Sequence, residues 1–195
     1  MKIAGVIIAG GRSSRMGREK AFALLSGRTI LSHIVERIAP QVTIIAINAN
    51  GDPDRFAETG LNVIPDVLGT GTPLAGLHAA LRFARCEGFD AALTIPSDAP
   101  FLPRDLVRRL SSARASAAIS QSGSQSHFLT GLWPHILLEK LEQTIGVQTV
   151  RVKDWTRYCN AATVAWPVEP FDPFFNVNTP QDLAEAERIT AEFSP

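Results

Sequence analysis

The sequence predicts an α/β protein in which helices cover both faces of a mostly parallel sheet. Apolar runs rich in β-branched residues, of the kind that forms buried parallel strands, occupy residues 3–8, 42–47, 61–64 and 91–95. Turns and helical patterns separate these runs, and the repeated order of strand, turn, helix and strand is typical of a parallel sheet. We therefore expect a three-layer, Rossmann-like sandwich with the first run as its central strand.

Composition limits the number of domains and the kinds of partner. A chain of 195 residues, 45% of them hydrophobic, suffices for one well-buried domain over residues 1–195. Nineteen basic side chains balance nineteen acidic ones, so no global field favours nucleic acid or an anionic membrane. The apolar runs are too short for a membrane span and no signal peptide is evident, which predicts a cytoplasmic protein. Cys86 and Cys159 form no CxxC pair and are expected to be reduced structural thiols.

The segment that follows the first apolar run is the clearest candidate for a binding site. Gly10 and Gly11 allow a sharp turn and a close approach to a ligand, and the cations Arg12, Arg15 and Lys20 follow. This combination predicts an anion-binding loop. It is neither a P-loop, which needs GK[ST], nor a dinucleotide fingerprint, which needs a third glycine in GxGxxG.

The spacing xAGGxxxRMGxxK resembles the opening motif of the GT-A-like nucleotidyltransferases. Its double glycine is similar to that of the molybdenum cofactor guanylyltransferases, the MobA family. The resemblance implies a GT-A-type sheet and catalytic roles for the cations Arg15 and Lys20. It also implies nucleotide contacts from Ile8, Ala9, Gly10, Gly11 and Lys20.

Helical spacing after Thr29 predicts a helix that this residue caps and Pro40 ends. The strand over residues 42–47 then leads to Asn48. Ligands of open α/β sheets bind at strand C-termini, so Asn48 is a candidate for contact with the sugar or base of a nucleotide. Asp66 follows the next strand, and its carboxylate can accept hydrogen bonds from N1 and N2 of guanine. The resembling family has both residues in its GTP site, although an ordinary Asn turn and a turn carboxylate are the plain alternatives.

A glycine-rich turn precedes the next predicted helix. Thr72 as N-cap and Pro73 at the first helical position predict its start, and leucines at helical spacing predict a buried face. The segment PLAG resembles the family's second motif, in which Gly76 would let the backbone contact the base. Without this context, the segment is simply a well-capped core helix.

Asp98 follows the fourth apolar run, between Pro96 and Pro100, which restrict the backbone on both sides. Mg²⁺ prefers one or two carboxylates together with phosphate oxygens and water, so one well-placed Asp suffices. The form PxDxPxxP resembles the family's metal-binding element. The alternative is a turn residue before a helix that begins at Pro103.

The second half of the chain predicts two further strands, at 116–120 and 161–165, and a helix opened by Pro134. Residues 121–126 are rich in Ser, Gln and Gly and predict a polar loop between strands, which could close over the acceptor. His127 lies in a segment that resembles a family strand, but Phe128 replaces the usual proline. We therefore expect His127 to be a structural residue.

The last motif, NxNTPxDL, combines a helix start with two asparagines. Thr179, Pro180 and Asp182 predict a capping box at the beginning of a helix. Asn176 and Asn178 alternate on the preceding segment, in a motif that resembles the family's final one. We expect Asn178 to be a second oxygen ligand of Mg²⁺ and Asn176 to contact the acceptor, with Asn178 beside it.

The resemblance implies Mg²⁺-dependent transfer of GMP from GTP to the phosphate of molybdopterin, with release of pyrophosphate. Residues 1–110 would then form a nucleotide-binding half and residues 111–195 an acceptor-binding half. We expect a monomer whose protein partners, if any, act in cofactor insertion or molybdoenzyme maturation. The alternatives are a cytidylyltransferase on the same scaffold and a non-catalytic nucleotide-binding or cofactor chaperone protein, while a nicotinamide dehydrogenase is disfavoured by the missing third glycine.

Overall fold

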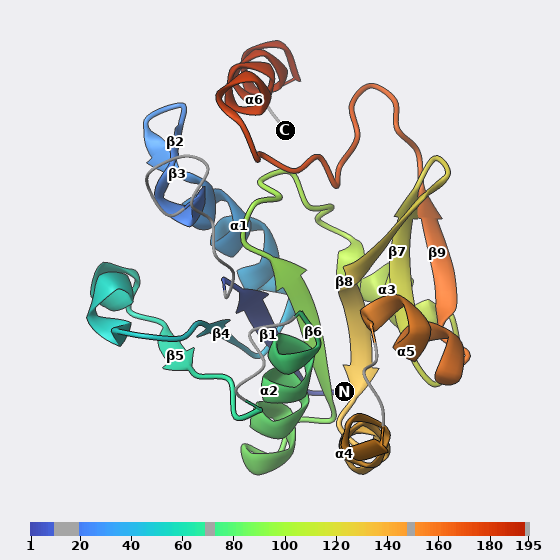
Figure 1. Cartoon of the computed structure of the whole chain (residues 1–195). Helices are drawn as coiled ribbons and strands as arrows, with labels where there is room; N and C mark the ends of the chain where they lie inside the picture. The colour runs from blue at the N-terminus through green and yellow to red at the C-terminus, as the bar shows by residue number, and fades with distance from the viewer. Residues whose placement is uncertain (10–19, 69–72, 148–150, 194–195) are drawn as a thin grey trace.

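The computed structural model describes residues 1–9, 20–68, 73–147 and 151–193. At its centre lies a seven-stranded sheet with the strand order β5-β4-β1-β6-β8-β7-β9 (Figure 1). The strands are β1 Ile3–Ile8, β4 Ile44–Asn48, β5 Asn62–Ile64, β6 Ala91–Pro96, β7 Ala118–Ser122, β8 Gln125–Pro134 and β9 Ala162–Trp166. Strand β8 is antiparallel to β6 and β7, and the other pairings in this sheet are parallel. The predicted mostly parallel α/β sheet is confirmed.

Strand β1 is buried over its whole length because it has neighbours on both edges and helices on both faces. It pairs with β4 on one side and with β6 on the other. Ile3 and Ile7 pack into one core cluster, while Val6 and Ile8 pack into a second cluster on the opposite face. Since successive strand residues point to opposite faces, a continuous apolar run is what such a strand requires.

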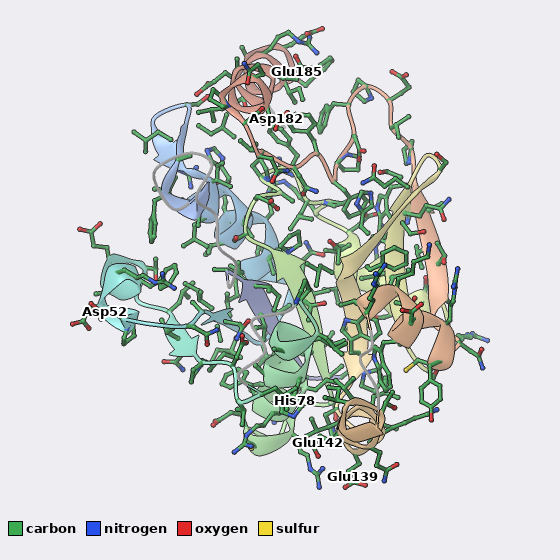
Figure 2. All side chains as sticks on the ribbon, viewed as in Figure 1. Asp52, His78, Glu139, Glu142, Asp182 and Glu185 are labelled. Atoms are coloured by element: carbon green, nitrogen blue, oxygen red, sulfur yellow. The ribbon has the colours of Figure 1, made fainter. Side chains whose placement is uncertain are left out.

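Helices form the two outer layers. The helices that pack into the larger core cluster are α1 Ile30–Ile38, α3 Leu106–Ser112 and α6 Pro180–Phe193. The helices on the opposite face are α2 Pro73–Cys86, α4 Leu137–Val147 and α5 Val152–Tyr158. Figure 2 shows His78 of α2 facing Glu142 of α4, and Nε2 of this buried histidine lies 3.0 Å from Oε1 of the glutamate. The arrangement is the predicted three-layer sandwich.

Two helix starts differ from the prediction in the same way. Helix α3 begins at Leu106 with Asp105 as its N-cap residue, and α4 begins at Leu137. The prediction placed these starts at Pro103 and Pro134. Pro134 instead ends β8, where it lies opposite Ala91 of β6. Proline is compatible with a first helical turn but also with the end of a strand, so it does not fix a helix start alone.

Residues 121–126, predicted as a polar loop, form the tip of a β-hairpin. Gln121 and Ser122 end β7, and Gln125 and Ser126 begin β8, with Ser122 paired to Gln125. Only two residues connect the strands, and Gly123 adopts a φ of 51°. Positive φ is what tight hairpin turns need. The polar composition gave no sign of the strands, although Ser122 is buried and paired with Trp166 of β9.

The described chain also contains several short elements. A two-stranded ribbon joins β2 Leu24–Leu25 to β3 Arg28–Thr29, and three 3₁₀ segments are η1 Lys20–Phe22, η2 Ala39–Gln41 and η3 Pro53–Thr59. Helix α5 was not predicted because it has only seven residues, of which Val152 and Trp155 reach the core. Within the described ranges, none of the helices has the length and apolar character needed to span a membrane.

Candidate functional site

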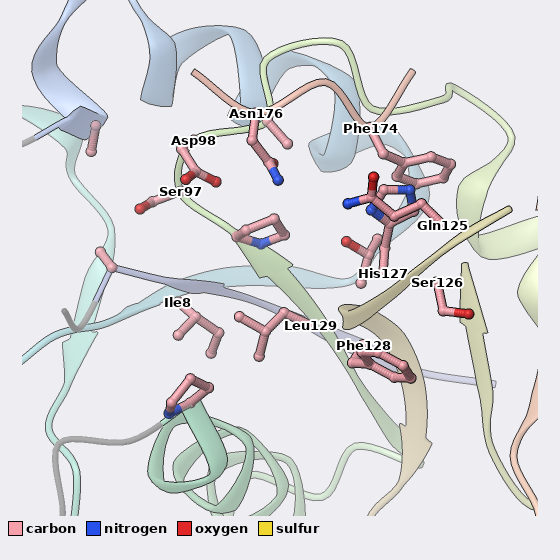
Figure 3. Close-up of a pocket in the computed structure, with 16 residues that line it drawn as sticks. Ile8, Ser97, Asp98, Gln125, Ser126, His127, Phe128, Leu129, Phe174 and Asn176 are labelled. Carbon is pink, nitrogen blue, oxygen red and sulfur yellow. The ribbon is translucent and has the colours of Figure 1, made fainter. Parts of the chain in front are cut away.

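A cavity of about 390 Å³ opens at the C-terminal ends of β1 and β6 (Figure 3). Ile8 and Ala9 line it from the end of β1, and Ser97 and Asp98 line it from the turn after β6. Strand β8 forms the opposite wall through residues 125–130, and Phe174 and Asn176 come from the segment before α6. Its volume is in the range of small-molecule sites. Its place at the carboxyl ends of parallel strands is where open α/β sheets bind ligands.

The segment before α6 is fastened to the turn that carries Asp98. The backbone N–H of Val177 donates a 2.8 Å hydrogen bond to the carbonyl oxygen of Asp98. In Figure 3 the side chains of Asp98 and Asn176 lie close together on the same side of the cavity. Two motifs that are far apart in the sequence therefore meet at one point of the site.

The donor set at this point is one that suits a hard divalent cation. Asp98 offers a carboxylate, and Ser97 and Asn176 offer neutral oxygens. Mg²⁺ is held by few protein oxygens and completes its octahedron with phosphate and water. The described residues contain no group of three His, Cys, Asp or Glu side chains that would hold a metal without a phosphate.

Asn178 belongs to the start of α6. Its backbone N–H and that of Thr179 both donate to Oδ2 of Asp182, at 2.9 Å and 2.8 Å, and the Asp182 N–H donates to Oγ1 of Thr179. The predicted capping box is confirmed; Figure 2 labels Asp182 at this helix start. Among the described residues, the cavity lining includes Asn176 and not Asn178.

Asn48 and Asp66 are in contact at the ends of β4 and β5. Asn48 is 1% exposed, and its side-chain Nδ2 donates to Oδ1 of Asp66 at 3.0 Å and to the carbonyl of Ile64 at 3.1 Å. Asn50 donates to Oδ2 of Asp66 at 2.8 Å, and its own Oδ1 accepts from the Asp66 N–H. Asparagines thus orient the carboxylate from two sides. The expected contact of Asn48 with a nucleotide stays a prediction, and its amide nitrogen is already engaged in holding Asp66.

Gly76 lies where α2 approaches the sheet most closely. A Cβ at this position would be 2.7 Å from Oδ1 of Asn48 and 2.9 Å from Cγ2 of Ile8. Both distances are shorter than non-bonded carbon contacts allow. The absence of a side chain at position 76 is therefore required by packing, whether or not the backbone also contacts a base.

The predicted anion loop lies largely outside the described residues. Gly10, Gly11 and Arg15 are not described, and of Lys20 only the backbone is, at the start of η1. The residues on either side of the loop, Ala9 and Ala21, both line the cavity, as does Pro73 at the start of α2. Their roles in binding a nucleotide stay predictions.

Comparison with known proteins agrees with this geometry. The model of the MobA-like NTP transferase domain matches residues 5–162. The chain belongs to this family.

Named relatives extend the match over nearly the whole chain. A molybdenum cofactor guanylyltransferase of Bradyrhizobium sp. (strain ORS 278) is 44% identical over 198 residues, covering 97% of this chain and 93% of the relative. One of Rhodopseudomonas palustris (strain HaA2) is 47% identical, with 94% and 90% covered. The crystal structure of molybdopterin-guanine dinucleotide biosynthesis protein A from Archaeoglobus fulgidus superimposes with a TM-score of 0.70 at 25% identity, covering 99% of this chain and 100% of that one.

This MobA-like NTP transferase contains a side-chain network that the sequence analysis did not find. Ser122 of β7 lies 2.7 Å from Nε2 of His127 and donates to Oδ2 of Asp172 at 2.9 Å. Phe174 stacks on the His127 ring with 4.6 Å between centroids. Burial lowers the pKa of His127, and the nearby Asp172 opposes this shift. Asp172 is 50 residues from Ser122 in sequence, so no local pattern links the two.

Proposed function

We propose that this enzyme transfers GMP from GTP to the phosphate of molybdopterin, giving the guanine dinucleotide form of the cofactor and pyrophosphate. The observation that carries the proposal is the identity of 42–47% with proteins named molybdenum cofactor guanylyltransferase over at least 93% of this chain. The cavity beside Asp98 supports it, because this is a site for a small molecule at the end of the strand that leads to the predicted anion loop.

Each half of the chain takes one substrate in this proposal. Residues 1–110 bind GTP through Ile8, Ala9, Gly10, Gly11, Lys20, Asn48, Asp66 and Gly76. Asp66 selects guanine by accepting from N1 and N2, which adenine cannot match. Residues 111–195 bind the acceptor along β8 and the segment that carries Asn176.

The reaction needs no nucleophile from the protein. A phosphate monoester has a second pKa of about 6, so an oxygen of the acceptor phosphate is already ionised near neutral pH and attacks the α-phosphorus. The bond from the α-phosphorus to the bridging oxygen breaks, and pyrophosphate leaves with the bonding electrons. Catalysis is then a matter of placing the two substrates and offsetting their repulsion.

Residues of this chain place the substrates and offset the repulsion between them. Arg15 and Lys20 offset the negative charge of the triphosphate and of the departing pyrophosphate. Asp98, with Asn176 beside it, would hold Mg²⁺. Asn178 would steady the segment that carries Asn176 or hold a water molecule bound to the cation. When bound, this cation supplies further positive charge at the phosphates.

Pyrophosphate release from purified enzyme, molybdopterin and either GTP or CTP tests the proposal. We expect release with GTP and not with CTP, and a fall of at least about 100-fold in Asp98→Asn, the scale of losing one electrostatic contact to the transition state. Asp54→Asn, which changes an exposed carboxylate on η3, is the matched control and should keep full activity. Equal turnover of CTP would reject the guanylyl assignment, and GTP binding without pyrophosphate release would favour the cofactor chaperone.

A further inference from the structure

The end of the cavity away from Asp98 is built differently from the end beside it. In Figure 3 Asp98 and Asn176 lie on one side, and His127, Phe174 and Gln125 lie on the other. The first side carries oxygen groups. The second carries an imidazole and an amide, with the half-buried ring of Phe128 also in the wall. A ligand that spans the cavity would meet charge at one end and a polar aromatic surface at the other.

The network behind His127 determines which of its ring nitrogens carries the proton. Asp172 accepts with both oxygens, Oδ1 from the Phe174 N–H at 2.8 Å and Oδ2 from the Ser122 hydroxyl. A serine hydroxyl has one proton, and Asp172 takes it. Ser122 Oγ can then only accept from His127 Nε2, which lies 2.7 Å away. The neutral ring is therefore protonated at Nε2 and bare at Nδ1.

Nδ1 is left as a hydrogen-bond acceptor. Within residues 1–9, 20–68, 73–147 and 151–193 it makes no hydrogen bond, and it is not among the fully buried atoms that lack a partner. His127 lines the cavity, and Phe174 stacked on one face restrains its ring. Lowering of the pKa by burial agrees with a neutral ring near pH 7. The ring is thus held in one place and in one tautomer.

We propose that His127 binds the heterocyclic end of the acceptor, accepting through Nδ1 a hydrogen bond from a ring or amino N–H group, with Ser122 and Asp172 as positioning residues. This assignment rests on the proposed function. The acceptor's phosphate must lie at the nucleotide end of the cavity, so the rest of the molecule extends toward the β7–β8 hairpin. A pterin is flat, stacks on aromatic rings and carries N–H donors, as this wall requires.

The first test needs no substrate. Nitrogen-15 NMR of the free enzyme near pH 7.5 should show His127 as the tautomer protonated at Nε2. Ser122→Ala removes the partner of Nε2, so the two tautomers should then exchange. A wild-type ring protonated at Nδ1 would overturn the proposal, as would a tautomer that Ser122→Ala leaves unchanged.

The second test measures the KM of each substrate in the His127→Gln enzyme. The Gln amide can still donate to Ser122 from the place of Nε2, but it puts no acceptor at the place of Nδ1. We expect the KM for molybdopterin to rise roughly tenfold, the factor for one lost hydrogen bond, while the KM for GTP changes less than about twofold. His135→Gln, a change beside Asp90 and outside the cavity lining, should alter neither KM.

Other outcomes would overturn the assignment. An unchanged KM for molybdopterin would exclude the contact, and a parallel rise in both KM values would indicate a structural role for His127. A wild-type enzyme that binds GTP but does not act on molybdopterin would refute the proposed function and, with it, the acceptor named here. Because the NMR experiment needs no acceptor, it tests the fixed tautomer of His127 separately from the proposed reaction.

Discussion

The side-chain oxygen of Asn48 lies where a side chain of residue 76 would begin: a Cβ on Gly76 would be 2.7 Å from it. This contact joins the end of β4 to the first turn of α2. It also closes a chain of contacts that runs from Gly76 through Asn48 to the carboxylate of Asp66. A substitution at position 76 should therefore alter the position of the Asp66 carboxylate, although the two residues come from different elements.

Gly76→Ala should destabilise the fold and weaken GTP binding. Alanine normally stabilises a helix interior by about 1 kcal/mol relative to glycine. Here the methyl group must displace Asn48 or Ile8, and overpacking of this kind costs about 1–3 kcal/mol. We expect a net loss of about 1 kcal/mol in the free energy of unfolding, measured with urea, and a weaker GTP affinity by titration calorimetry.

The Asn48→Ala background is the control for this interpretation. It removes the oxygen that the new methyl group would meet, so the cost of Gly76→Ala should fall, leaving the part due to Ile8. Strictly additive effects of the two substitutions would show that the contact between positions 48 and 76 does not transmit the change.

The sequence predicted best those features whose signals are local. Thr29 was expected to cap a helix, and its side chain accepts from the Ser32 N–H at the start of α1. The capping box at Thr179 and Asp182 was likewise read from residues three apart. Such caps depend on neighbours within one helical turn, so the local pattern suffices.

Features that depend on residues far apart in the sequence could not be predicted from local patterns. The hydrogen bond from Val177 to Asp98 and the one from Ser122 to Asp172 each join segments that only the folded sheet brings together. The hairpin at residues 121–126 was predicted as a loop, because polar side chains give no alternation of apolar and polar residues. His127 was expected to be a structural residue, and the proposal that it binds the acceptor depends on its place in the cavity wall and its contacts with Ser122 and Phe174.

Asp66→Asn should reduce the preference of the enzyme for GTP over ITP. Inosine lacks the 2-amino group that we expect the carboxylate to bind, and hydrogen bonds to charged groups contribute about 1.5–3 kcal/mol. Wild-type enzyme should therefore favour GTP by at least about tenfold in kcat/KM, and Asp66→Asn should bring the ratio close to unity.

Asp52→Asn is the matched control for the Asp66 variant. Asp52 is an exposed carboxylate near the same strand ends whose side chain accepts from the Asp54 N–H, a cap that asparagine also provides. The GTP preference should survive this change. A preference that also survives Asp66→Asn would remove Asp66 from base recognition.

The two cysteines should differ sharply in reactivity. Cys86 is exposed at the end of α2, whereas Cys159 is buried and its pKa is raised to about 11, chiefly by burial. At pH 8 only about one in a thousand Cys159 thiols would be ionised, and the thiolate is the reactive form. We expect Ellman's reagent to modify one thiol per native chain and two after unfolding. Rapid modification of native Cys86→Ser protein would contradict this.

The lowered pKa of His127 predicts how stability depends on pH. Burial disfavours the charged imidazole in the native state, so the unfolded chain takes up a proton near its ordinary pKa of 6.5 before the native chain does. The contribution of His127 is therefore fully present above that pH and is lost as the pH falls from about 7 through the native pKa. Because the ring is only part-buried, solvent screens the charge of the imidazolium and the loss should be small.

Urea unfolding at pH 8, 6.5 and 5 measures this effect. The wild-type free energy of unfolding should decrease toward pH 5 more than that of His127→Gln, which has no group titrating at this position. Asp172 is the charged neighbour that favours protonation, so Asp172→Asn should lower the native pKa further and steepen the decrease. Parallel curves for wild type and His127→Gln would mean that the imidazole ionises equally in the native and unfolded chains.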